Sequence, residues 1–209
     1  MKFIENQEWR YATKEFDPNR KITAEQLESL KKAIQLSVSS YGLQLYKVLI
    51  IENKEVRAKL RPASWNQSQI TDASHLFVFC NYTRVSEQNI DSYVELIAAT
   101  RELEKENLQG YGDFMKAKID EKSIDDQFQW TKHQTYIALA NLLSACAELK
   151  IDTCPMEGFE AATYNEVLGL TERGLNASVI VPVGYRSNTD TTQSLAKVRK
   201  PLAQLFEML

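Results

Sequence analysis

The run from His75 to Cys80 constrains the fold of this 209-residue chain more than any other stretch. It is an almost continuous apolar run, which is typical of a strand covered on both faces. The stretch from Asn176 to Val183 has the same character, although Pro182 predicts an edge position or a strand end there. Shorter strands are expected at 45–51 and 151–155. These segments predict a central sheet flanked by helices.

Helical periodicity accounts for much of the remaining chain. Thr23 and Gln26 match a capping box for a helix that runs to about Leu36. The clearest helix is predicted from about Ile124 to Lys150, where small residues would let another helix approach closely. Further helices are expected from about residue 54, over 86–107 and over 160–168. Gly110-Tyr111-Gly112 is expected to interrupt the helical pattern, and Gly169 to form a left-handed cap.

The order of these elements favours an α+β fold, because strands and helices alternate too irregularly for a doubly wound sheet. Hydrophobic residues make up 44% of the chain, which is enough for one substantial core. No linker or repeat is evident, so residues 1–209 are expected to form a single domain. The last stretch, about 184–209, has no evident place in the core of one subunit.

Charge and cysteine usage narrow the cellular setting. A net charge of −3 gives no global positive field for nucleic acid or an anionic membrane. No apolar run is long enough for a membrane span, and the N-terminus lacks a signal core, so a cytoplasmic protein is expected. Cys80, Cys146 and Cys154 are predicted to be packing thiols in a reducing compartment.

Several common chemistries lack their motifs. The seven glycines build neither GxGxxG after a strand nor GxxxxGK, which argues against a Rossmann site and a P-loop. His75 and His133 are the only histidines, and HExxH, CxxC and GxSxG are absent. A metal site or a hydrolase triad is therefore not expected. His75, at the start of an apolar strand, is expected to be a packing residue with satisfied hydrogen bonds rather than a general base.

Four short segments remain as candidates for a site. Arg10 and Lys14 form a basic cluster near one end of the chain, and Lys197 and Arg199 form another near the other. Such side chains suit a phosphate monoester, because guanidinium groups bind its oxygens in a fork. Taken alone, each cluster is more typical of a solvated charge pair than of an anion site. Ser39–Gln44 and Pro155–Phe159 are likewise compatible with an ordinary loop and an ordinary turn.

Taken in order, these segments resemble the motifs of the nitroreductase family. Arg10–Asp17 is similar to its N-terminal motif, Val38–Tyr46 to its serine-rich loop, and Asp72–His75 to its strand entry. Pro155–Phe159 and Lys197–Pro201 resemble its two C-terminal motifs. The resemblance spans nearly the whole chain. It implies a nitroreductase-like fold with a mostly antiparallel sheet, bound FMN and an intertwined homodimer whose C-terminal segment, about 184–209, extends over the partner.

The resemblance also implies roles for individual residues. Arg10, Lys197 and Arg199 would hold the FMN phosphate, and Lys14 would lie near N1 and O2 of the flavin, where it stabilises negative charge. Glu157 and Gly158 would present backbone N–H groups to N5 and O4. The other expected cofactor contacts are Ala12, Ser39, Ser40, Gln44, Asn66, Gln69, Pro155 and Met156, with Ser39, Ser40 and Gln44 supplied by the partner subunit. No catalytic protein nucleophile or base is implied, since FMN carries the chemistry.

The chain departs from the family pattern at several of these positions. Ala12 replaces the usual Ser, Val38 replaces Pro, and Leu45-Tyr46 replaces Pro-Trp. Gln69 stands where some members have a second Lys, which leaves Lys14 as the main cation at the ring edge. Weaker stabilisation of the reduced flavin is the expected consequence.

The implied activity is reduction of nitroaromatics, quinones or related small electrophiles by NADH or NADPH. The reductant and the oxidant would bind in turn to the same groove, which gives ping-pong kinetics. Tyr41, Tyr111 and Phe114 are the candidate substrate walls, with core packing as the alternative for the aromatic pair Tyr111 and Phe114. A narrower dihydropteridine or flavin reductase is the first alternative. A flavin-binding storage or sensor protein without useful turnover is the second.

Overall fold

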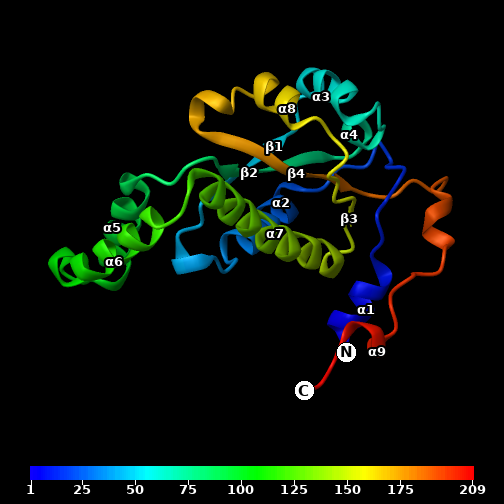
Figure 1. Ribbon diagram of the computed structural model, residues 1–209. Coiled ribbons are helices and arrows are strands. Elements are labelled where there is room, and N and C mark those ends of the chain that lie inside the picture. Colours follow the sequence, from blue (N-terminus) through cyan, green and yellow to red (C-terminus); the bar gives the residue numbers. More distant parts are fainter.

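The computed structural model describes all residues, 1–209, and is built around a four-stranded antiparallel sheet (Figure 1). The strands follow the order β1-β2-β4-β3. Their bounds are Tyr46–Ile51 for β1, His75–Tyr82 for β2, Asp152–Thr153 for β3 and Leu175–Gly184 for β4. Every residue of β2 except Tyr82 is buried. The predicted α+β fold with an antiparallel sheet is therefore confirmed.

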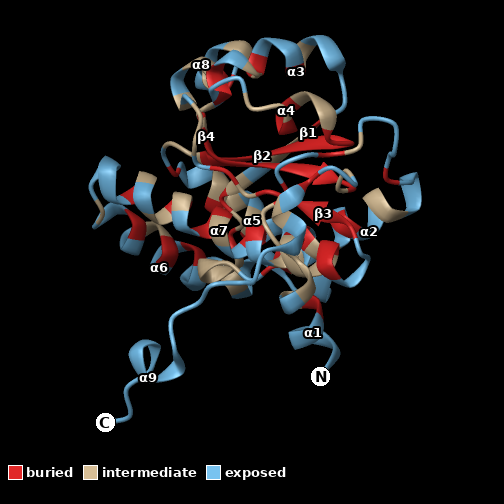
Figure 2. Ribbon diagram, turned by 90° about the vertical axis from the view of Figure 1, so that its right-hand side faces the viewer, coloured by how far each residue is buried: buried red, intermediate tan, exposed pale blue.

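Helices cover both faces of this sheet. α2 (Ala24–Gln35) and α7 (Ile124–Glu148) pack on one face, while α3 (Lys54–Leu60), α4 (Gln69–Asp72) and α8 (Ala161–Val167) pack on the other. Side chains of a strand alternate between faces, so Phe77 and Phe79 contact the α2 and α7 side while Leu76 and Val78 contact the other. Figure 2 shows the buried strands between the two helical layers.

The remaining helices lie outside these layers. α1 (Lys2–Trp9) packs beside the C-terminal end of α7, and α9 (Leu202–Leu205) follows near the chain end. α5 (Glu87–Arg101) and α6 (Gln109–Asp120) pair around a small core that includes Val94 and Met115. Figure 1 shows this pair at the opposite end of the molecule from α1. Single 3-10 turns lie at 40–42, 62–64, 105–108, 171–173 and 191–194. No helix combines the length and the apolar character that a membrane span requires.

The predicted capping box, left-handed cap and small buried helix residues are all present in the structure. The Thr23 hydroxyl accepts a hydrogen bond from the Gln26 amide at 3.2 Å, and the Gln26 side chain accepts one from the Thr23 amide at 2.9 Å. Gly169 follows α8 with a φ of +59°, as expected for a left-handed cap. Ala138 and Ala147 of α7 are fully buried, so the small residues of this helix permit close packing.

Two expectations in the variable middle of the chain are wrong. Gly110-Tyr111-Gly112 does not interrupt a helix but lies inside α6. A Cβ at Gly112 would lie 3.3 Å from Val94 Cγ2, so this glycine permits the close approach of α5 to α6. The helix predicted over 86–107 ends earlier, at Arg101, because Glu102 adopts a left-handed conformation with a φ of 54°.

The expectations for two strands also need correction. Of the strand predicted over 151–155, only Asp152 and Thr153 pair with β4. Pro182 does not lie on an edge, because β4 has β2 on one side and β3 on the other, but it does lie near a strand end, two residues before β4 ends at Gly184. Its carbonyl accepts from the Cys154 amide at 3.2 Å. The missing N–H is tolerated because the ladder to β3 is only two residues long.

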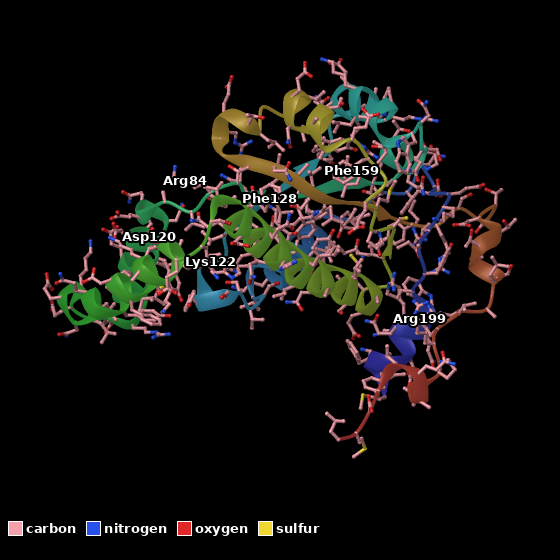
Figure 3. All side chains as sticks on the ribbon, in the orientation of Figure 1. Arg84, Asp120, Lys122, Phe128, Phe159 and Arg199 are labelled. Atoms are coloured by element: carbon pink, nitrogen blue, oxygen red, sulfur yellow. The ribbon has the colours of Figure 1, made fainter.

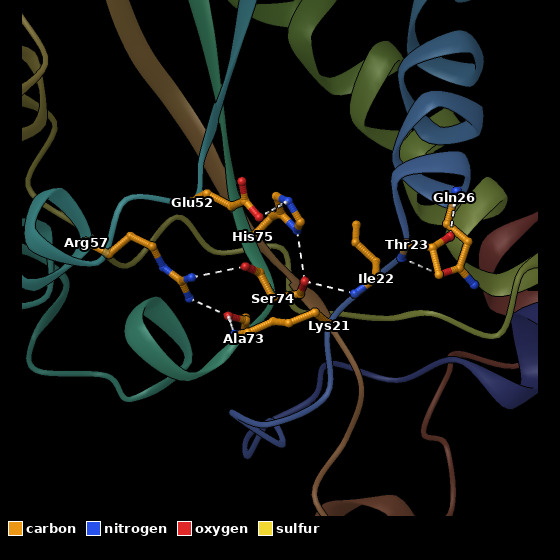
Figure 4. Close-up of polar contacts among 9 residues, drawn as sticks. All are labelled: Lys21, Ile22, Thr23, Gln26, Glu52, Arg57, Ala73, Ser74 and His75. Carbon is orange, nitrogen blue, oxygen red and sulfur yellow. Dashed lines mark hydrogen bonds and ion pairs between the residues drawn. The ribbon is translucent and has the colours of Figure 1, made fainter.

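A buried polar corner fixes the entry into β2 (Figure 4). The Arg57 guanidinium, 2% exposed, donates to the carbonyls of Ile70 (2.6 Å), Ala73 (2.6 Å) and Ser74 (3.1 Å). It thereby supplies a cation to the C-terminal carbonyls of α4. The His75 ring contacts the Ser74 hydroxyl at 2.9 Å and the Glu52 carboxylate at 3.3 Å. Burial lowers the pKa of His75. His75 is thus a packing residue with satisfied hydrogen bonds, as expected.

Candidate functional site

The N-terminal segment that follows α1 lies along the short strand β3. α1 ends at Trp9, and Arg10 is extended, with φ −70° and ψ 144°. The Thr13 amide donates to the Thr153 carbonyl at 3.2 Å, and Ala12 forms a parallel bridge with Thr153. These bonds place Ala12 and Lys14 beside Cys154 and the Pro155–Phe159 segment.

Cations from both ends of the chain converge at this segment. Arg10, Lys197 and Arg199 line one cavity of about 360 Å³ with residues of α1 and of the segment after η5 (Thr191–Ser194). The Lys197 ammonium donates to the Arg10 carbonyl. Burial, and then the positive charge of Arg199, lower the pKa of Arg10. Burial, and then the charges of Arg10 and Arg199, lower the pKa of Lys197. The three side chains are therefore close enough for their charges to interact, although Arg10 and Arg199 are 189 positions apart in the sequence.

This cluster fits a bound anion. Arg10 Nε is buried and has no hydrogen-bond partner in the chain, which is costly for a charged donor. Clustering like charges is also unfavourable unless a counter-charge is bound. A phosphate monoester would satisfy the free guanidinium donors and offset the repulsion. The chain's own residues thus fit the phosphate end of FMN.

Trp9 and Tyr11, the residues on either side of Arg10 in the sequence, both stack on the guanidinium of Arg186. The Arg186 guanidinium lies 4.5 Å from the ring centroids of both Trp9 and Tyr11. Its Nε donates to Asp152 Oδ1 at 2.9 Å, and Asp152 is 4% exposed. Arg10 is therefore held between two anchored aromatic residues. Sequence reasoning missed Arg186 and Asp152, because neither lies in a recognisable motif.

A second group of predicted residues surrounds Cys154, which is 2% exposed. Gln69 Nε2 lies 3.9 Å from the Cys154 sulfur. Burial raises the pKa of the Cys154 thiol, and the charge of Lys14 opposes this shift. Lys14 and Gln69 thus lie near the same buried thiol. Lys14 is exposed, and its charge has the largest effect of any charged side chain on the pKa of this thiol.

The Pro155–Phe159 segment presents free backbone donors. Met156 exchanges two hydrogen bonds with Ile180, of 2.8 and 3.1 Å, which ties the segment to β4. The amides of Glu157 and Gly158 donate to no acceptor in the chain. The Glu157 carboxylate accepts from the Tyr136 hydroxyl. The turn is therefore fixed while its two N–H groups stay available to an acceptor outside the chain.

Trp65 packs against this turn and was not predicted. A Cβ at Gly158 would lie 2.5 Å from the Trp65 ring, so only glycine permits the contact. Trp65 is 67% exposed, and both Trp65 and Asn66 have positive φ, of 55° and 57°. Gln67 Nε2 donates to the Gly158 carbonyl at 3.2 Å, which places Asn66 in the loop beside the turn. The only sequence signal was an aromatic residue directly before Asn66.

The Ser39–Gln44 loop forms a separate group with the predicted substrate residues. The Tyr41 ring makes edge contacts with Phe114 at 6.3 Å and with Trp130 at 6.2 Å. Burial raises the pKa of Tyr111. Tyr111 and Phe114 are 39% and 48% exposed. The Gln44 side chain is occupied within its own chain, because it donates to the Gln35 carbonyl at 2.9 Å. The Ser39 hydroxyl accepts from the Gln44 amide at 2.9 Å.

The cation group and the serine loop are attached to different parts of α7. The Ser40 amide is held by Gln134 of α7, whereas α1 is tied to Glu148 of the same helix through Asn6. Fourteen residues of helix separate the two attachment points, which is about 21 Å. Figure 3 shows Arg199 on the opposite side of the molecule from Lys122, which lies in the turn between α6 and α7. The Lys122 ammonium lies 5.9 Å from the ring of Trp130, which contacts Tyr41. The serine loop and the aromatic residues therefore cannot complete the cation site of their own chain.

Comparisons with known proteins identify the family and the fold. The nitroreductase family model matches residues 8–185. An oxygen-insensitive NAD(P)H nitroreductase of Salmonella typhimurium is 33% identical, over 92% of this chain and 93% of the relative. A protein of the same name from Enterobacter cloacae is 32% identical, over 94% of each chain. The fold is similar to that of a protein from Exiguobacterium sibiricum described as a nitroreductase in complex with FMN. The TM-score is 0.84 at 18% identity, over 99% of this chain and 97% of the other.

Proposed function

Because the chain belongs to the nitroreductase family, we propose that it is an FMN-dependent NAD(P)H oxidoreductase acting as a cytoplasmic homodimer. Its substrates are nitroaromatics, quinones or related small electrophiles, which take turns with NADH or NADPH in one groove. The relatives' names carry the NAD(P)H and nitroreductase part of this proposal. The FMN part is supported by the chain's own cation cluster and by the FMN complex of a similarly folded protein.

One observation carries the proposal: Arg10, Lys197 and Arg199 line a single cavity although they come from opposite ends of the sequence. A bound anion would offset their mutual repulsion and give the unpartnered Arg10 Nε an acceptor. A phosphate-bearing cofactor gives each of them a partner.

The neighbouring residues then take positioning roles. Bound FMN would accept hydride from NAD(P)H and pass it to the oxidant. Lys14 holds a positive charge at the ring edge, where negative charge would accumulate. The free amides of Glu157 and Gly158 act as fixed hydrogen-bond donors. Pro155 and Met156 hold the turn against β4, and Trp65 walls it from the side.

The second subunit completes the groove in this proposal. Ser39, Ser40 and Gln44 of one subunit would reach the cations of the other, together with Tyr41, Tyr111 and Phe114 as substrate walls. The separation of about 21 Å along α7 supports this, since one chain cannot join the two groups. The C-terminal segment 184–209 would extend over the partner. After η5 it exposes large apolar side chains, among them Leu195 (70%), Leu202 (74%) and Phe206 (66%), and Figure 2 shows it projecting from the core.

Colour and turnover test this function directly. The purified protein should be yellow or take up FMN, and anaerobic NADPH should bleach it. NAD(P)H oxidation should accelerate with menadione or nitrofurazone. Turnover restricted to a dihydropteridine or to free flavin would favour the narrower reductase, and bleaching without turnover would favour storage or sensing. A protein that cannot be reconstituted with FMN would contradict all three.

A further inference from the structure

A buried carboxylate joins the two ends of the chain just behind the cation cluster. Asp190 is 1% exposed, and it lies at the start of η5, seven residues before Lys197. One oxygen, Oδ2, accepts from the Tyr11 hydroxyl at 2.9 Å, from the Lys14 amide at 2.8 Å and from the Glu15 amide at 3.2 Å. The other, Oδ1, accepts from the Thr192 amide at 2.9 Å. Asp190 thus bonds the N-terminal segment with one oxygen and the C-terminal segment with the other.

Other contacts between these two segments involve residues before Asp190: the Asp17 amide donates to the Tyr185 carbonyl at 2.8 Å, and Arg186 lies over the rings of Trp9 and Tyr11. The Ser187 amide donates to the Glu15 carbonyl at 2.8 Å, and Thr189 Oγ1 donates to Glu15 Oε2 at 2.6 Å, both before Asp190 in the sequence. After η5 the chain is exposed and has no strand partner, and its one bond to the N-terminal segment runs from Lys197 to the Arg10 carbonyl. The place of Lys197 and Arg199 relative to Arg10 and Lys14 therefore depends on Asp190.

The charge of Asp190 has the wrong sign for an anion site. Coulomb attraction alone would favour its absence, because a carboxylate near bound phosphate is repulsive. The Asp190 carboxylate is buried and accepts hydrogen bonds from four donors, which instead indicates a structural role in holding the two segments. The hydrogen bonds from the Lys14, Glu15 and Thr192 amides lower the pKa of Asp190, against the effect of burial, so it is charged at neutral pH.

We propose that Asp190 is a positioning residue that holds the two cation-bearing segments at the spacing of one phosphate group. This rests on the proposed function, since the phosphate belongs to FMN. Asp190 touches neither cofactor nor substrate in this proposal. It acts through its hydrogen bonds to the Tyr11 hydroxyl, to the Lys14 amide and to the Thr192 amide, where the C-terminal segment begins.

The effect of Asp190→Asn on phosphate-bearing and phosphate-free flavin separates the alternatives. Asn keeps the shape but cannot accept on both sides, so one segment is released. We expect the FMN dissociation constant to rise about tenfold or more while riboflavin, which lacks the phosphate, binds within about twofold of wild type. Flavin fluorescence quenching gives both constants. A carboxylate that acts only through its charge would show the opposite sign, namely tighter FMN binding. General unfolding would weaken FMN and riboflavin equally.

Two further variants sharpen the test. Tyr11→Phe removes one of the donors to Asp190 and keeps the ring under Arg186, so it should give a smaller FMN-specific loss that is not additive with Asp190→Asn. Asp17→Asn is the matched control, because the Asp17 carboxylate accepts only from the nearby Asn19 amide. It should change neither constant. Unchanged or tighter FMN binding by Asp190→Asn overturns the inference, whereas absence of FMN binding by the wild-type protein would instead overturn the proposed function.

Discussion

At the scale of single residues, the cations of the site have two distinct environments. Burial, and then the charge of Arg199, lower the pKa of Arg10, and burial with the charges of Arg10 and Arg199 lowers the pKa of Lys197. Lys14, in contrast, lies exposed near Cys154. The first set suits binding of a phosphate, and the second suits stabilisation of charge on a ring. Substitutions in the two sets should therefore change different measured quantities.

Arg199→Ala should weaken FMN binding without a comparable effect on riboflavin. A hydrogen bond to a charged group is worth roughly 1.5–3 kcal/mol, which corresponds to about a tenfold to hundredfold rise in the FMN dissociation constant. Lys200→Ala, one residue further along the same exposed segment, is the matched control. Equal FMN affinities of the Arg199 and Lys200 variants would remove Arg199 from the phosphate site.

Lys14→Ala should instead slow anaerobic reduction of the bound FMN by NADPH, with only a modest loss of FMN. The loss of positive charge at the ring edge raises the energy of the electron-rich ring. Stopped-flow absorbance at the flavin band measures the rate, and Lys47→Ala, on β1, serves as a control. An unaltered reduction rate in the Lys14 variant would contradict the role assigned to it.

His75 gives a prediction about pH and stability. Its folded pKa is lowered by burial from an unfolded value of about 6.5. As pH falls through about 6.5, the unfolded chain gains a proton that the folded chain does not, so the free energy of unfolding decreases. His75→Gln should show a smaller loss of Tm between pH 7.5 and 5.5 than wild type. An identical pH dependence of Tm in both proteins would exclude this contribution.

At the scale of elements, the sequence predicted what local chemistry determines. The capping box of α2, the small buried residues of α7 and the apolar run of β2 follow directly from residue types. The pairing partners of the strands do not follow from residue types. Pro182, for example, lies in an interior strand, where its missing N–H is tolerated because the neighbouring strand β3 is only two residues long. Gly112 lies within α6 for a similar reason, because contact with Val94 outweighs helix propensity.

The candidate site shows the same division. The basic motifs at both ends were readable from the sequence, and the fold brings Arg10, Lys197 and Arg199 together. The residues that position them were not readable. Asp190, Arg186 and Asp152 act through contacts between segments more than 30 residues apart, which no short motif records. Trp65 was missed because its use depends on the absence of a side chain at Gly158.

The C-terminal element carries a prediction of its own. Leu205 and Phe206, 61% and 66% exposed in one subunit, should be covered by the partner. Phe206→Asp should shift the protein toward a monomer in light scattering and should cost FMN at low protein concentration, because the site is then incomplete. Gln204→Asp places the same charge on a polar position of α9. A Phe206→Asp protein that stays dimeric with full FMN would show that the segment does not cover the partner.

At the scale of the whole molecule, the cation group and the serine loop are attached at different positions on α7. The cations follow α1, which is bonded to Glu148, and the serine loop is bonded to Gln134, about 21 Å away along α7. In a two-fold dimer, the cation end of each subunit can meet the serine loop of the other, which gives two equal sites. Mutations at the two ends should then complement each other across subunits.

A mixed dimer tests the shared site most directly. One chain carries Arg10→Ala and Arg199→Ala, the other carries Ser40→Asp, and the heterodimer is isolated through two different tags. Each mutant homodimer should bind FMN poorly. The heterodimer should regain about half the wild-type FMN per dimer, because one of its two sites then contains only wild-type residues. A heterodimer that binds no more FMN than its parents would contradict the claim that one flavin phosphate is held between two subunits.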